Sequence, residues 1–589
     1  MKNRVFALVL TLVMLLGLAV PAFADNADTT TVTAQTMTEW EKAGYPEVTE
    51  LQIATVSDFK IFMEVLQEQS EPELKSVCEI KPDSNSTIAF VGVTIYLTAD
   101  LDLNPGWEST MDVSWDHLPN DDDFVQDSLD HAADSIAQLP EYTIQVHKGA
   151  TVNQKGFGGM FEGMGHTIVG LCIVSSNTAT AQSLFGVGHS ATDFVVGVRN
   201  LSIKNSYIEG TNHGLAALFG GITAGTDAVI ENCYVDVDLH STSTAAAKSN
   251  CSAGGLVGQV AGNLTIKNCV YAGDIFGGVL GRDDHRHVGA VAGLVVGGAI
   301  YDAEPANLTV ENFAFTGNIN WENSQRVSSL IGRVENQANV NLKNILALGG
   351  VLSNFGGLCR NIAGVKEGTT TTFNIENCLY HPNVSQTEVF EKTPEGGTIF
   401  AGYRMDEKSR KTGYLQLIVN KALQSTINKI PDVAYAFEGA ALGTVAASMK
   451  NIVIVDNKDY QGTAAANALT QYGIAGFQAV EEGYPLPSAL VAVFGTNVSG
   501  KSEITNPEEP TEPTEPSEPS EPSEPSSEPT ESAKPATKPT KAPANNNNTD
   551  AGNETSGDMT PVIIGIVVAV VVIGVVVTVV IINKKKAKQ

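Results

Sequence analysis

Acidic and imidazole side chains gather in one short stretch of the chain, residues 281–289, with the sequence GRDDHRHVG. Asp283 and Asp284 beside His285 are the residue types of a glycoside hydrolase, in which two carboxylates at a suitable separation share the acid–base work. His285, His287 and one aspartate could instead bind a divalent metal. The alternative interpretation is a solvated loop between strands. We expect that loop, and from this stretch alone we predict neither a catalytic residue nor a metal site.

A second acidic cluster, NDDDFVQDSLDHAAD, occupies residues 120–134 and offers the oxygen ligands that Ca²⁺ prefers. Its spacing is not that of an EF-hand, because the required glycine and bidentate glutamate do not follow. A solvated loop is the favoured interpretation, Ca²⁺ stays open as an alternative, and no other cofactor is expected.

Charge and cysteine content exclude several classes of protein. The formal net charge is −30, so the chain would repel nucleic acid phosphates, and no nucleic-acid partner is expected. Its seven cysteines are odd in number and sparse, and no C-x-x-C pair is present. This pattern fits neither a disulfide framework nor a structural zinc site. We expect the cysteines to be small buried side chains.

A short phrase recurs six times, and NLTIKNCVYAGDI from Asn263 is one copy. Polar and apolar residues alternate within each copy: in NCYVDVDL, Cys233, Val235, Val237 and Leu239 fall on one side. A period of two indicates a strand. Units of this size cannot bury an apolar face alone and must stack on one another. The sequence therefore predicts an all-β fold, a right-handed parallel β-helix.

All six copies share one asparagine. Stacked asparagine side chains can hydrogen-bond along the axis, at roughly 1 kcal/mol each, and asparagine tolerates the left-handed conformation that bends a coil. The residue that follows is expected to pack inward, in a slot that takes cysteine in three copies and Ser206, Phe313 or Ile345 in the others. The predicted ladder is Asn205, Asn232, Asn268, Asn312, Asn344 and Asn377, and the predicted stacked cysteines are Cys233, Cys269 and Cys378.

The repeats resemble a known bacterial motif. GGLVG at residues 254–258 matches the GLUG motif, named for Gly-Leu-x-Gly, and GGLCR at 356–360 matches it in part. FGGMFEGMGHTIVGLCI at 157–173 resembles the entry phrase of such solenoids, with Glu162 in place of the usual aspartate. The resemblance implies a GLUG-motif-containing bacterial cell-surface protein with a right-handed parallel β-helix ectodomain, and it implies no particular activity.

The two ends of the chain carry targeting features. Lys2 and Arg4 precede an apolar run, and the Ala-Phe-Ala of residues 22–24 fits a signal-peptide cleavage site. The uncharged apolar run at 562–582 is long enough to span a bilayer, and the lysines behind it indicate a cytoplasmic C-terminus. Residues 506–548 are rich in Pro and Glu and cannot form a core. The Leu-Pro-x-Thr-Gly sortase motif of Gram-positive surface proteins is missing, so we expect the membrane helix itself to retain the protein.

Helices are expected at residues 56–66, as a cap on the first coil, and at residues 413–429, where a mixed α/β closing region begins. The predicted organisation is a signal peptide (1–24), a flexible segment (25–50), an N-terminal cap with the first strands (51–156), GLUG-like β-helix repeats (157–397), an α/β closing region (398–500), a disordered Pro-rich stalk (501–560), a transmembrane helix (561–583) and a basic cytoplasmic tail (584–589).

These features predict a single-pass protein of a Gram-positive-like bacterial cell membrane, with its ectodomain outside. It would display the β-helix for adhesion, or for binding a glycan or a host or matrix protein. One alternative is a cell-bound polysaccharide lyase or glycoside hydrolase of the parallel β-helix type. Another is a passive surface-layer component. The absence of a spread catalytic constellation favours a protein that is not an enzyme, and the sequence leaves the oligomeric state open.

Overall fold

The computed structural model describes residues 32–499 with gaps. The gaps are residues 68–77, 81–86, 109–138, 147–155, 176–181, 191–193, 211–213, 242–251, 279–283, 299–303, 323, 353–356, 364–367, 382–400, 406–412, 418–428, 431, 439–442, 456–460 and 463. The predicted signal peptide, stalk, membrane span and basic tail, and the acidic cluster at 120–134, lie outside the described residues. No helix within the described part of the chain is long and apolar enough to cross a membrane.

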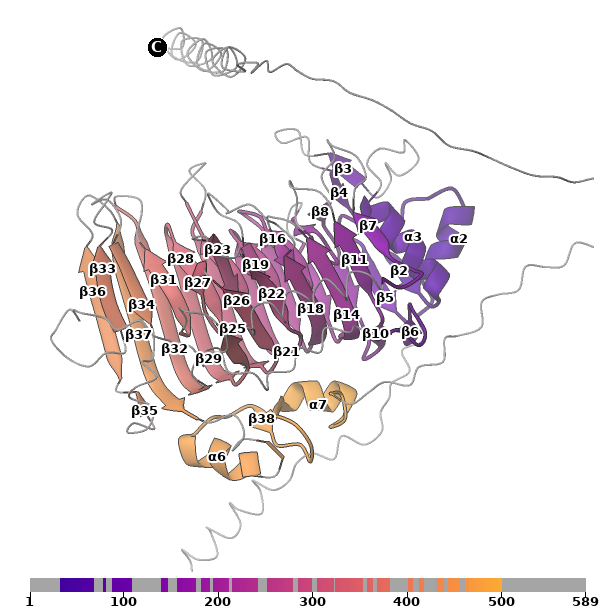
Figure 1. Ribbon diagram of the computed structural model, residues 1–589. Helices are drawn as coiled ribbons and strands as arrows, with labels where there is room; N and C mark the ends of the chain where they lie inside the picture. The colour runs from indigo at the N-terminus through magenta and orange to yellow at the C-terminus, as the bar shows by residue number, and fades with distance from the viewer. Residues whose placement is uncertain are drawn as a thin grey trace, which may run out of the picture. The chain divides into compact units, whose positions relative to one another are not determined.

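Strands of successive coils lie side by side in layers, mostly parallel, so the described chain is predominantly β and forms a parallel β-helix (Figure 1). The largest sheet has 22 strands. Its strands are β1 (Gln35–Thr36), β2 (Glu50–Ile53), β5 (Thr94–Leu97), β6 (Leu101–Asp102), β7 (Ile144–Val146), β9 (Met160–Glu162), β10 (Thr167–Val169), β11 (Cys172–Ser175), β13 (Val196–Arg199), β14 (Ser202–Gly210), β17 (Asp227–Glu231), β18 (Tyr234–Ser241), β21 (Asn263–Tyr271), β22 (Ile275–Gly278), β25 (Ala306–Phe315), β26 (Asn318–Glu322), β29 (Ala338–Ala347), β30 (Gly350–Leu352), β32 (Thr370–Tyr380), β35 (Lys429–Ile430), β36 (Val433–Glu438) and β37 (Thr444–Ile454).

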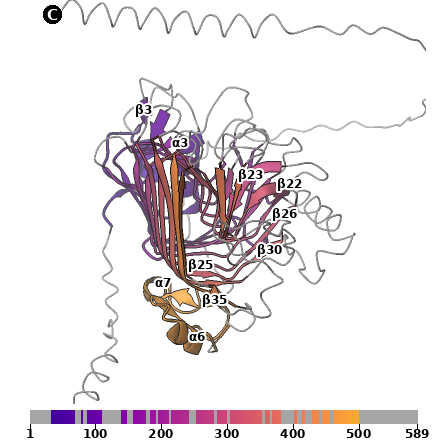
Figure 2. The same cartoon turned by 90° about the vertical axis from the view of Figure 1, so that its left-hand side faces the viewer.

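Two further sheets complete the coils. The second contains β3 (Cys78–Ile80), β4 (Thr87–Ala89), β8 (Gly156–Phe157), β12 (Val187–Gly188), β16 (Phe219–Ile222), β20 (Val257–Val260), β24 (Ala292–Val296), β28 (Ile331–Glu335), β31 (Cys359–Ala363), β33 (Ala401–Met405) and β34 (Gly413–Leu417). The third contains β15 (Leu215–Ala216), β19 (Ser252–Gly254), β23 (Asp284–Gly289) and β27 (Ser324–Val327). Figure 2 looks along the stack, where the strands of successive coils overlap.

Apolar side chains from the facing sheets fill the interior of the coils. The expected alternation holds in β18, where Val235, Val237 and Leu239 are fully buried. Near the N-terminal end the core is aromatic: Phe185 lies between Phe157 and Phe219, with ring centroids 5.1 and 5.2 Å apart. Because every coil adds to one continuous apolar core, each coil is stabilised mainly by its two neighbours.

Two helices, α2 (Met37–Lys42) and α3 (Val56–Gln67), close the N-terminal end of the stack (Figure 1). The cap helix predicted at 56–66 is therefore confirmed as α3. Asp58, only 1 % exposed, joins the two helices. Its carboxylate accepts hydrogen bonds from the backbone N–H groups of Thr38 and Thr55, at 2.9 and 3.1 Å. These hydrogen bonds satisfy backbone N–H groups near the start of both helices, which would otherwise be buried without an acceptor.

Antiparallel strands finish the stack at its C-terminal end. β37 pairs parallel with β32 as a further coil, and β36 pairs antiparallel with β37. The helix predicted over 413–429 is wrong in its described residues, because Gly413–Leu417 form β34, which pairs antiparallel with β31 and β33, and Lys429–Ile430 form β35. Here the unpaired edge of the sheet satisfies the backbone groups of the segment, and this tertiary pairing overrides local helix propensity.

The last described segment folds back along the stack. It consists of α6 (Ala464–Tyr472), β38 (Phe477–Gln478), β39 (Leu486–Pro487) and α7 (Ser488–Phe494), and α6 and α7 lie together beside the sheet (Figure 2). Leu469, Ile474 and Leu490 pack on outward-facing side chains such as Val270 and Leu379. The segment therefore covers the outer surface of several coils rather than the end of the stack.

A ladder of asparagine amides runs along the largest sheet. Asn232 donates through Nδ2 to Oδ1 of Asn200 at 2.9 Å, Asn268 donates to Asn232 at 3.0 Å, and Asn312 donates to Asn268 at 2.9 Å. The series continues through Asn344, Asn377 and Asn451 at 3.1, 3.2 and 2.9 Å. All seven residues have a positive φ between 51° and 59°. Asparagine thus bends each coil and links it to the next.

Asn205 is not part of this ladder, which corrects the sequence alignment. Asn200 takes its place beside Asn232, whereas Asn205 donates to the carbonyl of Trp107 at 2.6 Å. The strand register explains the difference. β13 pairs with β17 up to the residue before each ladder asparagine, and Asn205 lies further on, at a register shift between β14 and β18. The sequences around Asn200 and Asn205 are alike, but only Asn200 is in register with the other ladder asparagines.

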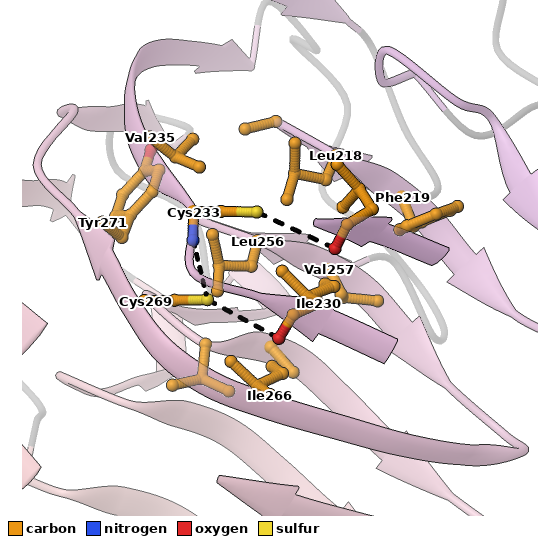
Figure 3. Close-up of a cluster of buried hydrophobic side chains, with 14 of the residues drawn as sticks. Leu218, Phe219, Ile230, Cys233, Val235, Leu256, Val257, Ile266, Cys269 and Tyr271 are labelled. Carbon is orange, nitrogen blue, oxygen red and sulfur yellow. Dashed lines mark hydrogen bonds between the residues drawn. The ribbon is translucent and has the colours of Figure 1, made fainter. Parts of the chain in front are cut away.

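The cysteines that follow the bend face the core. Cys233 and Cys269 lie on adjacent coils, both fully buried and both free thiols (Figure 3), and Cys378 is buried in the same slot two coils after Phe313. The Asn200 register puts Leu201 in this slot, so the expectation of Ser206 there is wrong. A slot that accepts leucine, cysteine and phenylalanine is a packing position.

Replacing Asn268 tests the ladder. Asn268→Ala removes two side-chain hydrogen bonds, at about 1 kcal/mol each, and forces a Cβ residue without a polar group into the left-handed region, which adds about 1 to 2 kcal/mol. Asn268→Gly removes the same hydrogen bonds but accepts the positive φ. We therefore expect alanine to destabilise the solenoid by about 1 kcal/mol more than glycine, measured by urea denaturation. Equal losses would contradict the role of the bend.

Candidate binding face and buried polar cluster

From Asp284 onward, the acidic and imidazole stretch lies in the wall of the solenoid. Asp283 lies outside the described residues, and so do the side chains of Asp284 and His285. From Asp284 the chain forms β23, in which Arg286 and His287 are 1 % and 0 % exposed. The expectation of a solvated loop is therefore wrong from residue 284 onward, because pairing with β19 and β27 brings this segment into the third sheet.

Contacts with strands of two sheets explain why two basic side chains can be buried here. The guanidinium of Arg286 lies over the ring of Trp321, 5.7 Å from its centroid, a distance at which a cation–π interaction is favourable. Arg326 Nη1 lies 2.6 Å from Nε2 of His287 on the neighbouring strand. These contacts stabilise the wall of the solenoid. Among the residues the structure describes, no group of three or more His, Cys, Asp or Glu could hold a metal ion.

The outward side chains that precede the ladder are in register from coil to coil, and except for Gly197 and Val229 in one column they are largely polar. We call this surface the outer face; it is formed by β13, β17, β21, β25, β29, β32 and β37. Directly before each ladder asparagine stands a charged residue, and Glu162 on β9 starts the series. Acidic and basic residues alternate without exception along this charge column. Its members are Glu162, Arg199, Glu231, Lys267, Glu311, Lys343, Glu376 and Lys450.

Alternation puts opposite charges on adjacent coils, about 4.8 Å apart along the stack. Arg199 Nε lies 3.6 Å from Glu231 Oε2, and Lys450 Nζ lies 3.0 Å from Glu376 Oε1. The contact with Glu376 raises the pKa of the Lys450 ammonium. Pairs this exposed contribute little stability each, but a slip of one coil would put like charges side by side and be disfavoured.

A second polar column runs parallel to the first, at the start of the same strands. Asn263 donates to Asp227 at 2.7 Å, and Asn307 donates to Asn263 at the same distance. Asn339 and Thr372 extend the amide column at 3.0 and 2.9 Å. The outer face therefore carries hydrogen-bonding groups in straight rows, repeated from coil to coil.

Two shallow hollows lie on this face on either side of Arg199. One, of about 510 Å³, is lined by Glu50, Tyr96, Glu162 and Asn200 together with Val32, Thr33, Met164 and, from α7, Val493. The Tyr96 hydroxyl donates to Glu50 at 3.3 Å. The other, of about 430 Å³, is lined by residues 195, 199, 227–229, 231, 263, 265 and 267. Both linings combine charged, amide and hydroxyl groups with apolar side chains, such as Met164 in the first hollow and Val229 in the second.

A buried polar cluster lies on the outward side beyond the bend. The Tyr207 hydroxyl donates to Glu209 Oε2 at 2.8 Å and lies 3.0 Å from His240 Nδ1. Glu209 and His240 are each 8 % exposed, and Trp107 and Phe276 belong to the apolar group packed around Tyr207. Phenol, carboxylate and imidazole in mutual contact are the groups of general acid–base chemistry.

Burial shifts the pKa values of this cluster. It lowers the pKa of the His240 imidazole to about 4 and raises the pKa of the Glu209 carboxyl. The same loss of hydration, together with the charge of Asp238 on the adjacent coil, raises the pKa of Asp274. The histidine is therefore neutral near pH 7. Shifted titrations of this kind occur at active sites and also in structural networks.

Neither feature was identified from the sequence, although one left a clear signal. An apolar residue, a charged residue and asparagine recur as VRN at 198–200, IEN at 230–232, IKN at 266–268, VEN at 310–312, LKN at 342–344, IEN at 375–377 and MKN at 449–451. Aligning on the three residues together would have revealed the alternating charges, but it would not have selected Asn200 over Asn205, because the same triplet occurs as IKN at 203–205. The Tyr207 cluster has no comparable signal, because its members come from different coils.

In the described residues the fold is a parallel β-solenoid with a largely polar outer face and an apolar face that α6, β39 and α7 cover. In comparisons with known proteins, no family model, no curated protein and no solved structure matches this chain.

The neutral, buried His240 makes the stability of the solenoid depend on pH. Its pKa of about 4 in the folded chain lies below the ordinary value of about 6.5, so between these values the unfolded chain binds a proton that the folded chain does not. Stability should therefore fall as the pH drops below 6.5, by about 2 kcal/mol at pH 5. His240→Gln, which can still hydrogen-bond Tyr207, should lack this loss.

Urea denaturation of both proteins at pH 7 and pH 5 measures the difference. Glu209 changes stability in the opposite direction, since its pKa is raised mainly by burial. It is present in both proteins, so the comparison isolates His240. The same pH dependence in both proteins would contradict the assignment.

Proposed function

We propose that this chain is a bacterial cell-surface adhesion protein that binds its ligand along the outer face of the solenoid. The observation that carries this proposal is the set of in-register polar columns, with a hollow on each side of Arg199. A row of repeated polar groups suits an extended ligand, since each coil offers one more equivalent contact. Many weak contacts along one surface can together give useful avidity.

The attachment to a cell belongs to the same proposal. The predicted signal peptide, Pro-rich stalk and membrane span would export the solenoid and hold it away from the bilayer. The repeats resemble GLUG motifs of secreted bacterial proteins, and this resemblance supports a right-handed solenoid with a role at the surface. An acidic chain of net charge −30 suits an exposed position, because charge keeps a protein soluble.

Reversing one charge at the centre of the two hollows tests the proposal. Purified full-length chain in detergent is applied to immobilised glycans and extracellular proteins, and to plates coated with cells of the producing species. Arg199→Glu should weaken binding by about tenfold, equivalent to about 1.4 kcal/mol, because it adds a carboxylate between Glu162 and Glu231. Lys42→Glu on α2 is the matched control, with the same change of charge away from the face.

Equal binding by the wild type and Arg199→Glu would exclude the outer face as the binding site. Binding lost to the same extent in Lys42→Glu would show only a general effect of net charge.

The second candidate function is a polysaccharide lyase or glycoside hydrolase. The observation that favours it is the cluster of Tyr207, Glu209 and His240, whose hydrogen bonds could hold a proton donor and acceptor together. The three side chains are buried, and burial favours the neutral form of the Glu209 carboxyl. Both properties fit a structural hydrogen-bond network at least as well as they fit an active site.

An assay for new reducing ends and for unsaturated products, on a panel of polysaccharides, separates the two functions. An enzyme that uses this cluster would lose cleavage in Tyr207→Phe, which removes one hydroxyl and keeps the ring. A surface adhesion protein without catalysis would release no product in either form while its binding is unchanged.

A further inference from the structure

The charge column is electrically neutral, on a chain that is strongly acidic. Four carboxylates and four basic groups alternate along it, whereas the whole chain carries −30. Two copies of an acidic protein generally repel one another. Along the charge column itself that repulsion is locally cancelled, whereas Asp227 and Asp432 beside it keep a negative charge.

The order of charges has a further property: it is complementary to itself when reversed. Read from Glu162 to Lys450 the column begins with a negative charge and ends with a positive one, and the number of charged positions is even. If two copies face each other with their coils running in opposite directions, Glu162 meets Lys450, and Arg199 meets Glu376. In the same arrangement Glu231 meets Lys343, and Lys267 meets Glu311. Every position then lies opposite an opposite charge.

Only one orientation has this property. A two-fold axis parallel to the strands, passing between the coils of Lys267 and Glu311, places each column on its own counterpart with the coils reversed. A two-fold axis along the stack would put each charged residue opposite itself, and like charges would repel. In the neighbouring column, Thr265 then meets Thr309, and both hydroxyl groups can donate and accept a hydrogen bond. The rest of that column adds no complementary pairs, because Asn341, Asn374 and Ser448 lie opposite Val229, Gly197 and Met160.

The side chains remain available for such pairing. Lys343 and Lys450 are exposed, and the side chain of Glu376 is 45 % exposed even in contact with Lys450. An ammonium has three donors and a carboxylate about four acceptor sites, so one neighbour on the same face does not exhaust either.

The area is enough for a weak but specific contact. Eight coils at about 4.8 Å and strand arms of five residues give roughly 600 Å² on each copy. The total of about 1,200 Å² is at the lower limit of specific interfaces. Such a polar interface favours reversible association between many copies held on surfaces rather than a permanent dimer.

We propose that the partner bound by the outer face is a second copy of this chain, paired with its coils reversed, so that adhesion is between like molecules. This inference rests on the proposed function of the outer face. It names the occupant of that face, and it requires neither a glycan nor another protein.

The mass of the full-length chain in detergent, measured by sedimentation over a range of protein concentrations, tests the pairing. At low salt the wild-type mass should rise toward that of a dimer, and about 1 M NaCl, where charges are screened within about 3 Å, should abolish the rise. Lys267→Glu and Glu311→Lys should each remain monomeric, because each puts like charges together at both central contacts. Lys42→Glu is the matched control and should dimerise like the wild type.

Mixing the two variants provides the decisive measurement. In an equimolar mixture of Lys267→Glu and Glu311→Lys, the two central contacts again join opposite charges, so the mixture should dimerise although neither protein does so alone. The double variant Lys267→Glu/Glu311→Lys should also dimerise with itself. Circular dichroism of each variant checks that the solenoid is folded.

A wild type that stays monomeric at every concentration, or a mixture that stays monomeric, would overturn the inference. So would equal loss of dimers in Lys42→Glu. If the wild type is monomeric but Arg199→Glu still reduces binding to a glycan or another protein, the pairing of copies fails and the proposed function stands. If neither self-association nor any binding depends on the outer face, both fail.

Discussion

The structure depends on one constraint, the in-register stacking of parallel coils, in which each residue has its counterpart from the next coil as its nearest lateral neighbour. The hydrogen bond between successive asparagine amides, such as Asn268 to Asn232 at 3.0 Å, is where this constraint is most visible. The asparagine must adopt a positive φ to bend the chain, donate a hydrogen bond to the amide of the coil before it, and accept one from the amide of the coil after it. A residue that meets these three requirements sets the strand register on both sides of the bend.

The two surfaces of the sheet follow from that register. Before the bend, outward positions are polar and form the charge column and the amide column; after it, Val270, Ala314 and Leu379 face outward and are covered by α6, β39 and α7. The closing segment also touches the ladder, since Tyr472 accepts a hydrogen bond from Asn451. Since the closing segment covers the side after the bend, the outer face remains an accessible surface of the described solenoid. We therefore propose the outer face as the binding surface.

The buried polar groups are brought together by strand pairing between successive coils, and sequence motifs do not predict their positions. Arg286 and His287 belong to the wall, beside Trp321 and Arg326, although their stretch had the composition of an active site. Tyr207, Glu209 and His240 come together because β14 and β18 pair, with Glu209 level with His240. Sequence spacing gives no warning of this cluster, because its partners are separated by a whole coil.

The sequence alone determined the period-two strands, the stacking of repeats, the bending asparagines from Asn232 to Asn377 and the helix at 56–66, since each depends on local alternation or on residues that recur. It did not determine the register of Asn200 against Asn205, the strand at Gly413–Leu417, or the path of the closing segment. Those were decided by tertiary structure, because an unpaired sheet edge or an uncovered apolar face can be satisfied only by residues distant in the chain. For the same reason the alternating charges were visible as letters, but only the stacked coils make them neighbours.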